Sequence, residues 1–275
     1  MNRIFNPIFL LLIFSTILFS FPAFANYTLD GRYVQGGLLI GKTLPGTLVK
    51  LDKLSIQVSD KGYFVIGFDR DHAAQSKLQL TYPDGRTENK IIKIVKREYN
   101  IQRIDNLPKR KVTPEKMDLV RIRKESALVK KARDRDDART DYLSGWVWPV
   151  KGRISGVYGS QRILNGKPRR PHFGVDVAAP NGTLVRAPAD GIVTLAYPDM
   201  FFSGGTLIID HGQHLSSSFL HLSEILVKEG DRIQQGDPIA RVGATGRVTG
   251  PHLDWRMNFH KFQIDPQLLV PPMEE

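Results

Sequence analysis

The chain has 275 residues with no cysteine, and its 39 Lys and Arg outnumber its 28 Asp and Glu, for a formal net charge of +11. This length is enough for two modest domains with a sizeable core. The lack of cysteine excludes disulfides and a lipid-modified cysteine anchor. The strong positive charge favours an anionic partner such as a cell wall or a membrane surface.

The amino terminus has the features of an export signal. Arg3 precedes an apolar run from Ile8 to Phe19, and Ala23-Phe24-Ala25 forms an A-x-A cleavage site. We therefore predict a signal peptide at residues 1–25 and a mature protein in the periplasm. The alternative is that the apolar run stays uncleaved as an inner-membrane anchor. Export, together with the lack of a basic-aromatic recognition motif, argues against nucleic acid as a partner.

Residues 26–108 alternate short apolar runs with turn residues, which predicts a small β-sandwich domain. Pro83-Asp84-Gly85 is typical of a hairpin turn. No residues of this segment indicate chemistry, and wall binding or covering of an active site are both open roles for it. The predicted strands are 36–41, 47–51, 62–67, 78–82 and 91–95.

Residues 109–144 predict a charged helical linker. Thr113-Pro114-Glu115 suits a helix start, because Thr can cap free amides, Pro is tolerated at the first position and Glu favours the positive end. The helix is expected to run to about Arg139. Its apolar stripe is thin, which favours a solvated connector, with a partner-binding arm as the alternative.

Residues 145–275 predict a second domain built of strands, so the fold class is mainly β: an amino-terminal β-sandwich, a helical connector and a carboxy-terminal β-sheet domain. Apolar runs broken by glycine mark its strands at 191–196, 204–212, 227–233 and 236–243. Residues 152–170 are expected to form a long loop ahead of a polar motif.

That motif is His172-Phe173-Gly174-Val175-Asp176, in which two metal-binding side chain types stand four residues apart. Gly174 is expected to allow a tight turn between them. Farther along, Leu253 and Trp255 alternate with His252, Asp254 and Arg256, which predicts a strand with one polar face. His221-Leu222 lies between the two stretches. We expect all three segments to converge on one cluster.

These motifs resemble the lysostaphin-type (LytM-domain) zinc metallopeptidases, which act on peptidoglycan. The family pattern is H-x-G-x-D, then a His-Leu segment, then H-x-H after Gly-Pro, and the likeness covers roughly residues 146–270. The resemblance implies a β-sheet domain of the duplicated hybrid motif type. One departure stands out, because Asp254 occupies the position of the second His of H-x-H, which is a zinc ligand in the family.

The resemblance also implies roles for individual residues. His172, Asp176 and Asp254 would hold one zinc ion, with an open position for water, and His252 would be the general base. His221 would stabilise the oxyanion or carry the proton. Another divalent metal is an alternative, because two carboxylates make the ligand set richer in oxygen. His214 and His260 match no catalytic position and are expected at the surface.

Basic residues near the motif are candidates for substrate binding. Arg162 and Arg170, together with Lys167 and Arg169, are expected to meet carboxylates of wall peptides. Arg256 has two open roles: it either pairs with Asp254 and competes with the metal, or points to the substrate.

Two functions follow from the resemblance. The first is an exported endopeptidase that hydrolyses peptide cross-links of peptidoglycan with a metal-activated water. Asp254 in place of His makes the metal centre less positive, which predicts a slower enzyme or a more alkaline optimum. The alternative is an inactive LytM-like activator of a cell-wall amidase or a wall-binding scaffold. Partners would then be peptidoglycan and an amidase or a division or elongation complex.

Overall fold

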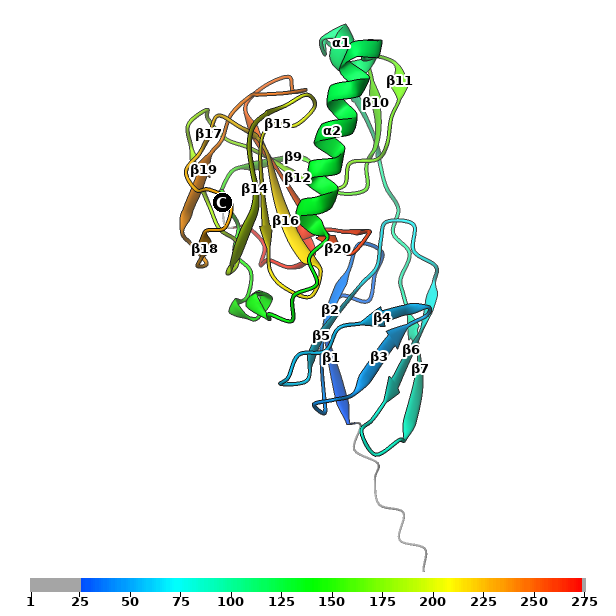
Figure 1. The fold of residues 1–275 in the computed structure, drawn as a ribbon. Coiled ribbons are helices and arrows are strands. Elements are labelled where there is room, and N and C mark those ends of the chain that lie inside the picture. Colours follow the sequence, from blue (N-terminus) through cyan, green and yellow to red (C-terminus); the bar gives the residue numbers. More distant parts are fainter. Residues whose placement is uncertain (1–25, 274–275) are drawn as a thin grey trace, which may run out of the picture.

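The structure is a computed structural model that describes residues 26–273, and most of its regular elements are β-strands (Figure 1). The predicted mainly β fold class is confirmed. The predicted signal peptide lies outside the described residues. Between residues 26 and 273, no helix combines the length and apolar character that crossing a bilayer requires.

The amino-terminal part of the chain forms two sheets that share a core. Its strands are β1 (Tyr27–Gly31), β2 (Leu38–Thr43), β3 (Leu48–Leu51), β4 (Leu54–Ile56), β5 (Tyr63–Gly67), β6 (Gln75–Thr81) and β7 (Thr87–Lys93). One sheet has the order β1-β2-β5 and the other β4-β3-β6-β7. Alternate residues of β6 are buried, as expected for a strand with one face on the core. The amide of Gly85 donates to the carbonyl of Tyr82, 2.9 Å away, in the predicted hairpin turn.

All five strands predicted within 26–108 overlap an observed strand, but β1, β4 and β8 (Ile101–Ile104) were not predicted. β1 is mostly exposed and β4 has only three residues, so neither carries a clear apolar alternation. The predicted domain boundary at residue 108 stays a prediction.

A third sheet joins the amino-terminal part to the segment ahead of His172. It consists of β8 (Ile101–Ile104), β10 (Gln161–Leu164) and β11 (Lys167–Pro168), in the order β11-β10-β8. β9 (Arg153–Gly156) lies in the same segment, so the prediction of a loop over 152–170 is wrong. The reason is that β10 pairs in parallel with β8, a partner far away in the sequence that local patterns do not reveal.

Two helices follow β8: α1 (Lys109–Val112) and α2 (Lys116–Arg133). The predicted helix from Thr113 to Arg139 is therefore too long at both ends. Glu115, not Thr113, caps α2, and the Asp118 carboxylate accepts from the Glu115 amide at 3.1 Å in a reciprocal capping box. Beyond α2, Arg139 pairs with the buried Asp210 and is no longer helical.

The remaining strands build one large sheet and one small sheet. The large sheet contains β9 together with β12 (Val175–Ala178), β14 (Gly191–Met200), β15 (Gly204–Asp210), β16 (Leu215–Leu222), β18 (Arg232–Ile233), β20 (His252–Phe259) and β21 (Phe262–Ile264). Its order is β18-β14-β15-β16-β20-β12-β9, with β21 paired to β20. The small sheet contains β13 (Leu184–Arg186), β17 (Glu224–Ile225) and β19 (Pro238–Arg241). Two short helical turns are η1 (Asp141–Ser144) and η2 (Pro266–Leu268).

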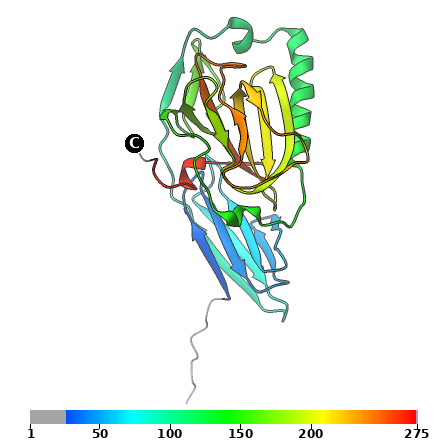
Figure 2. The ribbon, with the colours of Figure 1, turned by 90° about the vertical axis from the view of Figure 1, so that its left-hand side faces the viewer.

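α2 packs on the large sheet rather than standing free in solvent (Figures 1 and 2). Ala132 of α2 belongs to an apolar cluster with Leu195 of β14 and Ile208 of β15. Glu125 of α2 is buried and accepts a hydrogen bond from the amide of Phe201 at 2.8 Å. Every residue of β15 and β16 is buried, because these central strands have covered faces. The expected solvated connector thus includes a helix that forms part of the core.

Direct polar contacts link the amino-terminal sheets to the large-sheet part. Arg97 pairs with the buried Asp265 at 2.8 Å. Gln213 donates from its side chain to the carbonyl of Tyr63 at 2.9 Å and accepts from the hydroxyl of Tyr142 at 2.7 Å. These contacts involve residues far apart in the sequence, and they hold the two parts against each other.

His211, which follows β15, is fully buried and held in one tautomer. Its Nδ1 lies 2.5 Å from the carbonyl oxygen of Asp190, which can only accept, so Nδ1 carries the proton. Nε2 then accepts from the hydroxyl of Ser217 at 2.7 Å, and the indole of Trp146 packs edge-on against the ring. Burial lowers the pKa of His211 from 6.5 to about 4. The native structure therefore holds this imidazole neutral.

We expect His211 to make folding stability depend on pH. The unfolded chain takes up a proton near pH 6.5 and the folded chain only near pH 4, so this contribution is complete above pH 6.5 and is lost as the pH falls towards 4. The loss is about 3 kcal/mol of unfolding free energy. Urea unfolding at several pH values should show a smaller decline in His211→Gln than in the wild type. Equal declines in the two proteins would contradict this assignment.

Candidate metal centre and catalytic site

The two aspartates of the predicted cluster face each other across neighbouring strands. β12 and β20 are antiparallel, and their register places Asp176 opposite Asp254 and Ala178 opposite His252. Both carboxylates are buried, Asp254 completely. Like charges placed directly opposite in a sheet destabilise it, so this pair needs positive charge nearby.

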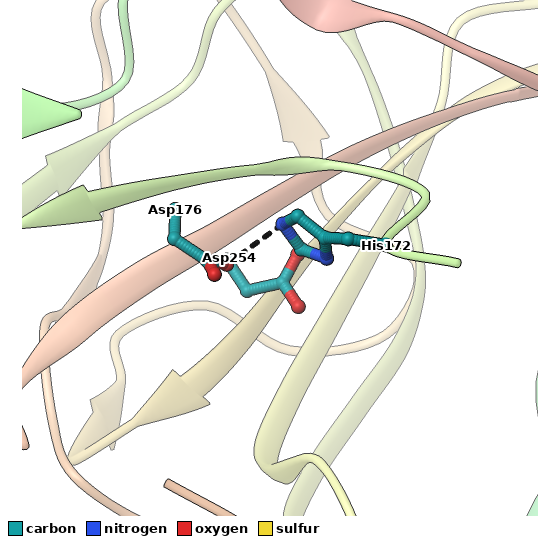
Figure 3. Close-up of side chains that lie close together, drawn as sticks. All are labelled: His172, Asp176 and Asp254. Atoms are coloured by element: carbon teal, nitrogen blue, oxygen red, sulfur yellow. Dashed lines mark ion pairs between the residues drawn. The ribbon is translucent and has the colours of Figure 1, made fainter. Parts of the chain in front are cut away.

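His172 completes the cluster from the segment just before β12 (Figure 3). Its amide donates to the carbonyl of Ser160 at 2.9 Å, and its own carbonyl accepts from the amide of Gly159 at 2.7 Å. The ring is buried, and one ligand atom from each of His172, Asp176 and Asp254 lies within 4.8 Å of the others. The three side chains predicted to hold a metal are therefore brought together.

Unsatisfied atoms in this cluster fit a bound cation. Nε2 of His172 lies 3.0 Å from Oδ1 of Asp176, but the two are outside hydrogen-bonding geometry. Both ring nitrogens of His172 and Oδ1 of Asp176 are buried without a hydrogen-bond partner among the described residues. Leaving such groups buried and unpaired is costly. One imidazole and two carboxylates are suitable ligands for zinc or another divalent ion, so the residues present fit a metal.

Two arginines pair with the two aspartates. Arg256 donates from Nε to Oδ1 of Asp254 at 2.9 Å and from Nη2 to Oδ2 at 2.5 Å. Arg162 donates from Nη2 to Oδ2 of Asp176. Each carboxylate oxygen has a second lone pair, so these bonds leave positions for a metal. Of the two roles open to Arg256, the structure shows the pairing with Asp254.

The pKa values of both aspartates are lowered in spite of their burial. Burial by itself raises the pKa of Asp254, but the charges of Arg256 and His172 lower it by more. Burial likewise raises the pKa of Asp176, and His172 and Arg162 reverse the shift, against the opposing effect of the Asp254 charge. Both groups are therefore held as carboxylates, the form that binds metal.

Gly174 is required by close packing, and its backbone is not in the left-handed region. A Cβ at this position would lie 2.6 Å from the carbonyl oxygen of Trp255 and 2.7 Å from Oδ1 of Asp254. The expected tight turn is therefore not the reason for this glycine. Gly156 on β9 has a similar role, because a Cβ there would lie 2.2 Å from Oδ2 of Asp176.

The two predicted catalytic histidines lie side by side beside the cluster. The rings of His221 and His252 are 4.9 Å apart between centroids, and Nε2 of His252 lies 3.8 Å from Oδ1 of Asp176. Nδ1 of His252 donates to the carbonyl of Gly250 at 2.9 Å, and Nδ1 of His221 donates to the carbonyl of Thr245 at 2.8 Å. In neutral imidazoles, this arrangement leaves both Nε2 atoms as acceptors.

His221 is buried at the end of β16 with a positive φ of 66°. Burial lowers its pKa to about 4, with the charge of Asp254 acting in the opposite direction. The ring is thus neutral near pH 7. The carbonyl of Thr245, which orients the His221 ring, was not identified from the sequence. The one sequence feature that could have pointed to Thr245 is its place in the glycine-rich run Gly243–Arg247.

A cavity of about 690 Å³ opens onto this site. His172 and His221 line it, as does the exposed Arg170, while Ile122, Ser126, Val129 and Arg133 of α2 form part of its wall. Among the described residues, no side chain from 26–108 lines this cavity. α2, and not the amino-terminal sheets, therefore forms part of the border of the site, a role that sequence patterns did not indicate.

His214 and His260 are not open surface residues. Their rings stack with centroids 4.0 Å apart, and both are half-buried. They line a second cavity of about 870 Å³ between the β3–β4 turn, α2 and the β20–β21 hairpin. The prediction that both lie at the surface is met only in part, because this hairpin packs against the amino-terminal part and leaves both rings partly exposed.

Residues 170–266 match the sequence profile of peptidase family M23. By this match, these residues form a peptidase M23 domain. The match confirms the resemblance to lysostaphin-type peptidases and makes this a domain of a metallopeptidase family. It includes every residue of the cluster and both catalytic candidates.

Relatives of the M23 domain include enzymes that act on peptidoglycan. Peptidoglycan DD-endopeptidase ShyA of Vibrio cholerae serotype O1 is 40% identical over 115 residues, which cover 40% of this chain and 26% of the relative. DD-carboxypeptidase/endopeptidase Mpg of Neisseria meningitidis serogroup B is 37% identical over 126 residues, 46% of this chain and 29% of the relative. The chain thus spans only about a quarter of the length of these relatives.

A solved structure resembles the chain beyond the M23 domain. It is that of a proposed peptidase M23 from Pseudomonas aeruginosa, 29% identical, with a TM-score of 0.67 over 86% of this chain and 95% of the other. The similarity includes sequence outside residues 170–266, so the amino-terminal sheets and the M23 domain occur together in both proteins.

We expect Gly174→Ala to destabilise the M23 domain. The added methyl group would press on the backbone of β20 and on the Asp254 carboxylate, which should lower the free energy of unfolding by about 1–3 kcal/mol. Gly250→Ala is the matched control, because a Cβ there meets no atom within 4 Å. Urea unfolding should separate the two variants, and equal stabilities would contradict the proposed packing.

Proposed function

We propose that this protein is an exported, metal-dependent endopeptidase that hydrolyses peptide cross-links of peptidoglycan. The observation that carries the proposal is the buried cluster of His172, Asp176 and Asp254, with unpaired ligand atoms and two acceptor imidazoles beside it. The family and the names of the DD-endopeptidase relatives support peptidoglycan as the substrate. Action on peptidoglycan also supports a periplasmic location.

His172, Asp176 and Asp254 would hold one divalent ion, zinc by analogy with the family. When bound, such an ion supplies a Lewis acid that polarises the scissile carbonyl and acidifies a water molecule. The chain contributes by holding three ligands in a buried, rigid setting. The pairing of β12 with β20 fixes the two carboxylates. His172 is fixed by the hydrogen bonds of its own backbone to Gly159 and Ser160.

His252 is placed to act as the general base. Its Nδ1 is committed to the carbonyl of Gly250, so Nε2 is free to accept a proton, 3.8 Å from Oδ1 of Asp176. The Asp176 carboxylate would stabilise the imidazolium that results. His221, neutral and with its own Nε2 free, is better suited to carry the proton onward than to donate to an oxyanion.

Arg162 and Arg256 compensate for the extra carboxylate. One imidazole and two carboxylates would neutralise a divalent ion, which weakens its action on the substrate. The two guanidiniums offset the two carboxylates, so the charge of the ion remains uncancelled around the site. This compensation is compatible with catalysis. The main role of the two arginines is then to pair with the aspartates, and binding of substrate is secondary. Arg170, exposed at the cavity edge, remains free to bind substrate.

The metal content of the mature protein tests the proposal. We expect one metal per chain in protein purified without chelator, loss of that metal in Asp254→Ala and retention in Asp254→His, because imidazole is the ligand used by the family at this position. Asp60→Ala, at an exposed turn, is the control and should keep the metal. The rate at which peptide cross-links of isolated peptidoglycan are hydrolysed should fall by at least about 100-fold in Asp254→Ala.

The absence of metal from the wild-type protein would count against the proposal. Wild-type protein without metal, together with gain of metal in Asp254→His, would contradict the endopeptidase proposal. Activation of a purified wall amidase by that protein would then support the alternative, a LytM-like activator.

A further inference from the structure

A short loop between β19 and β20, residues 243–247, contacts both histidines beside the proposed metal centre. The carbonyl of Thr245 accepts from Nδ1 of His221 at 2.8 Å, and the carbonyl of Gly243 accepts from the amide of His252 at 3.2 Å. The loop contains no helix and no strand, so its shape depends on contacts with other segments. The orientation of the His221 ring therefore depends on what holds this loop in place.

The hydroxyl of Thr245 anchors the loop to two strands of the large sheet. It accepts a hydrogen bond from the amide of Gly205 on β15 and donates one to the carbonyl of Leu222 on β16, each at 2.9 Å. Gly205 and Leu222 are opposite in the register of the two strands, and the register shifts just beyond Gly205. One side chain thus joins the loop to the two strands at the end of β16, where His221 lies.

Close packing restricts the loop further. Gly204, at the start of β15 with φ of 60°, runs so near that a Cβ there would lie 2.1 Å from Oγ1 of Thr245. A Cβ on Gly246 would lie 2.5 Å from the carbonyl oxygen of Phe202, and the amide of Arg247 donates to that carbonyl at 2.8 Å. The loop and the start of β15 are therefore in direct contact on both sides of Thr245.

His221 depends on such support because its backbone conformation is uncommon. Its φ of 66° lies in the left-handed region, which residues other than glycine seldom adopt. The amide of His221 donates to the carbonyl of Ser203 at 2.8 Å, and Thr245 holds the ring. A carbonyl oxygen can only accept, so the bond from Nδ1 also fixes the tautomer and leaves Nε2 as the acceptor.

We propose that Thr245 is a positioning residue for His221: its hydroxyl holds the loop so that its carbonyl sets the orientation and the tautomer of the ring. This inference rests on the proposed function, in which His221 carries a proton beside the metal centre. Without the hydroxyl, the amide of Gly205 and the carbonyl of Leu222 would each lose a partner, and the loop would shift. Thr245 does not line the cavity, so substrate binding should change little while proton transfer slows.

The kinetic test removes the hydroxyl and keeps the shape of the side chain. With a soluble cross-linked peptide fragment of peptidoglycan, Thr245→Val should lower kcat about tenfold or more and change KM less than about twofold. Thr245→Ser keeps the hydroxyl and should retain most of the wild-type kcat. Thr183→Val is the matched control, because the hydroxyl of Thr183 donates to the carbonyl of Pro180 in an exposed turn. This control should keep both kinetic constants.

A second measurement detects the tautomer in the absence of any turnover. Nitrogen NMR spectra of the histidine rings of the mature protein should show the proton of His221 on Nδ1 in the wild type and in Thr245→Ser, and a mixture of tautomers in Thr245→Val. The signal of His221 is assigned by its loss in His221→Gln. His211, whose Nδ1 is held by the carbonyl of Asp190, is the internal control and should keep its tautomer in every variant.

The outcomes separate this inference from the proposed function. A wild-type protein with the proton of His221 on Nε2, or Thr245→Val with the wild-type tautomer, overturns it. An equal loss of kcat in Thr245→Ser and Thr245→Val also overturns it, because only one of these variants lacks the hydroxyl. If Thr245→Val does not fold, Thr245→Ala removes the hydroxyl with a smaller side chain and takes its place. A tautomer that changes in a protein without cleavage activity supports the positioning role and contradicts only the proposed function.

Discussion

The structure depends on a pair of buried carboxylates that face each other across two neighbouring strands. Asp176 and Asp254 are opposite in the register of β12 and β20, and nothing in a β-sheet by itself stabilises such a pair. Cations must lie close by, and the chain supplies Arg162 and Arg256. Both ring nitrogens of His172 and Oδ1 of Asp176 stay without a hydrogen-bond partner among the described residues, which fits a bound metal. The site is therefore an electrostatic arrangement in which each negative group has a positive neighbour.

This arrangement gives a physical reason why Asp can replace His at position 254. A lone substitution would remove positive charge from the metal centre, but Arg256 stands two residues on along the same strand and donates two hydrogen bonds to the new carboxylate. The lowered pKa of Asp254 has the same origin, since burial opposes ionisation and the arginine more than offsets it. The same bond would make Asp254 a less basic ligand, so the proposed metal site would depend on the other two ligands as well.

α2 connects the organisation of the whole chain to the site. It belongs to the segment between the amino-terminal sheets and the M23 domain, yet Ala132 is part of the core, and Arg133 reaches Ser218 on β16. The third sheet adds a second connection, because β8 pairs with β10 just ahead of His172. The amino-terminal part is therefore joined to the site through packing and strand pairing as well as through the covalent chain.

The sequence by itself was sufficient for the mainly β class, the family, and the residues of the cluster, because these rest on local signals: apolar alternation, turn residues, and motifs such as His172 to Asp176 at fixed spacing. It did not predict the strands within 152–170, the length of α2, or the stacking of His214 on His260. It also did not show that Gly174 is needed for close packing against β20, or that Arg133 and Arg247 face the site. These features depend on tertiary contacts between segments far apart in the sequence, and local sequence patterns do not predict such contacts. Only the tertiary structure brings Arg133 of α2 and His221 of β16 to the same cavity, because burial and charge pairing act between neighbours in space.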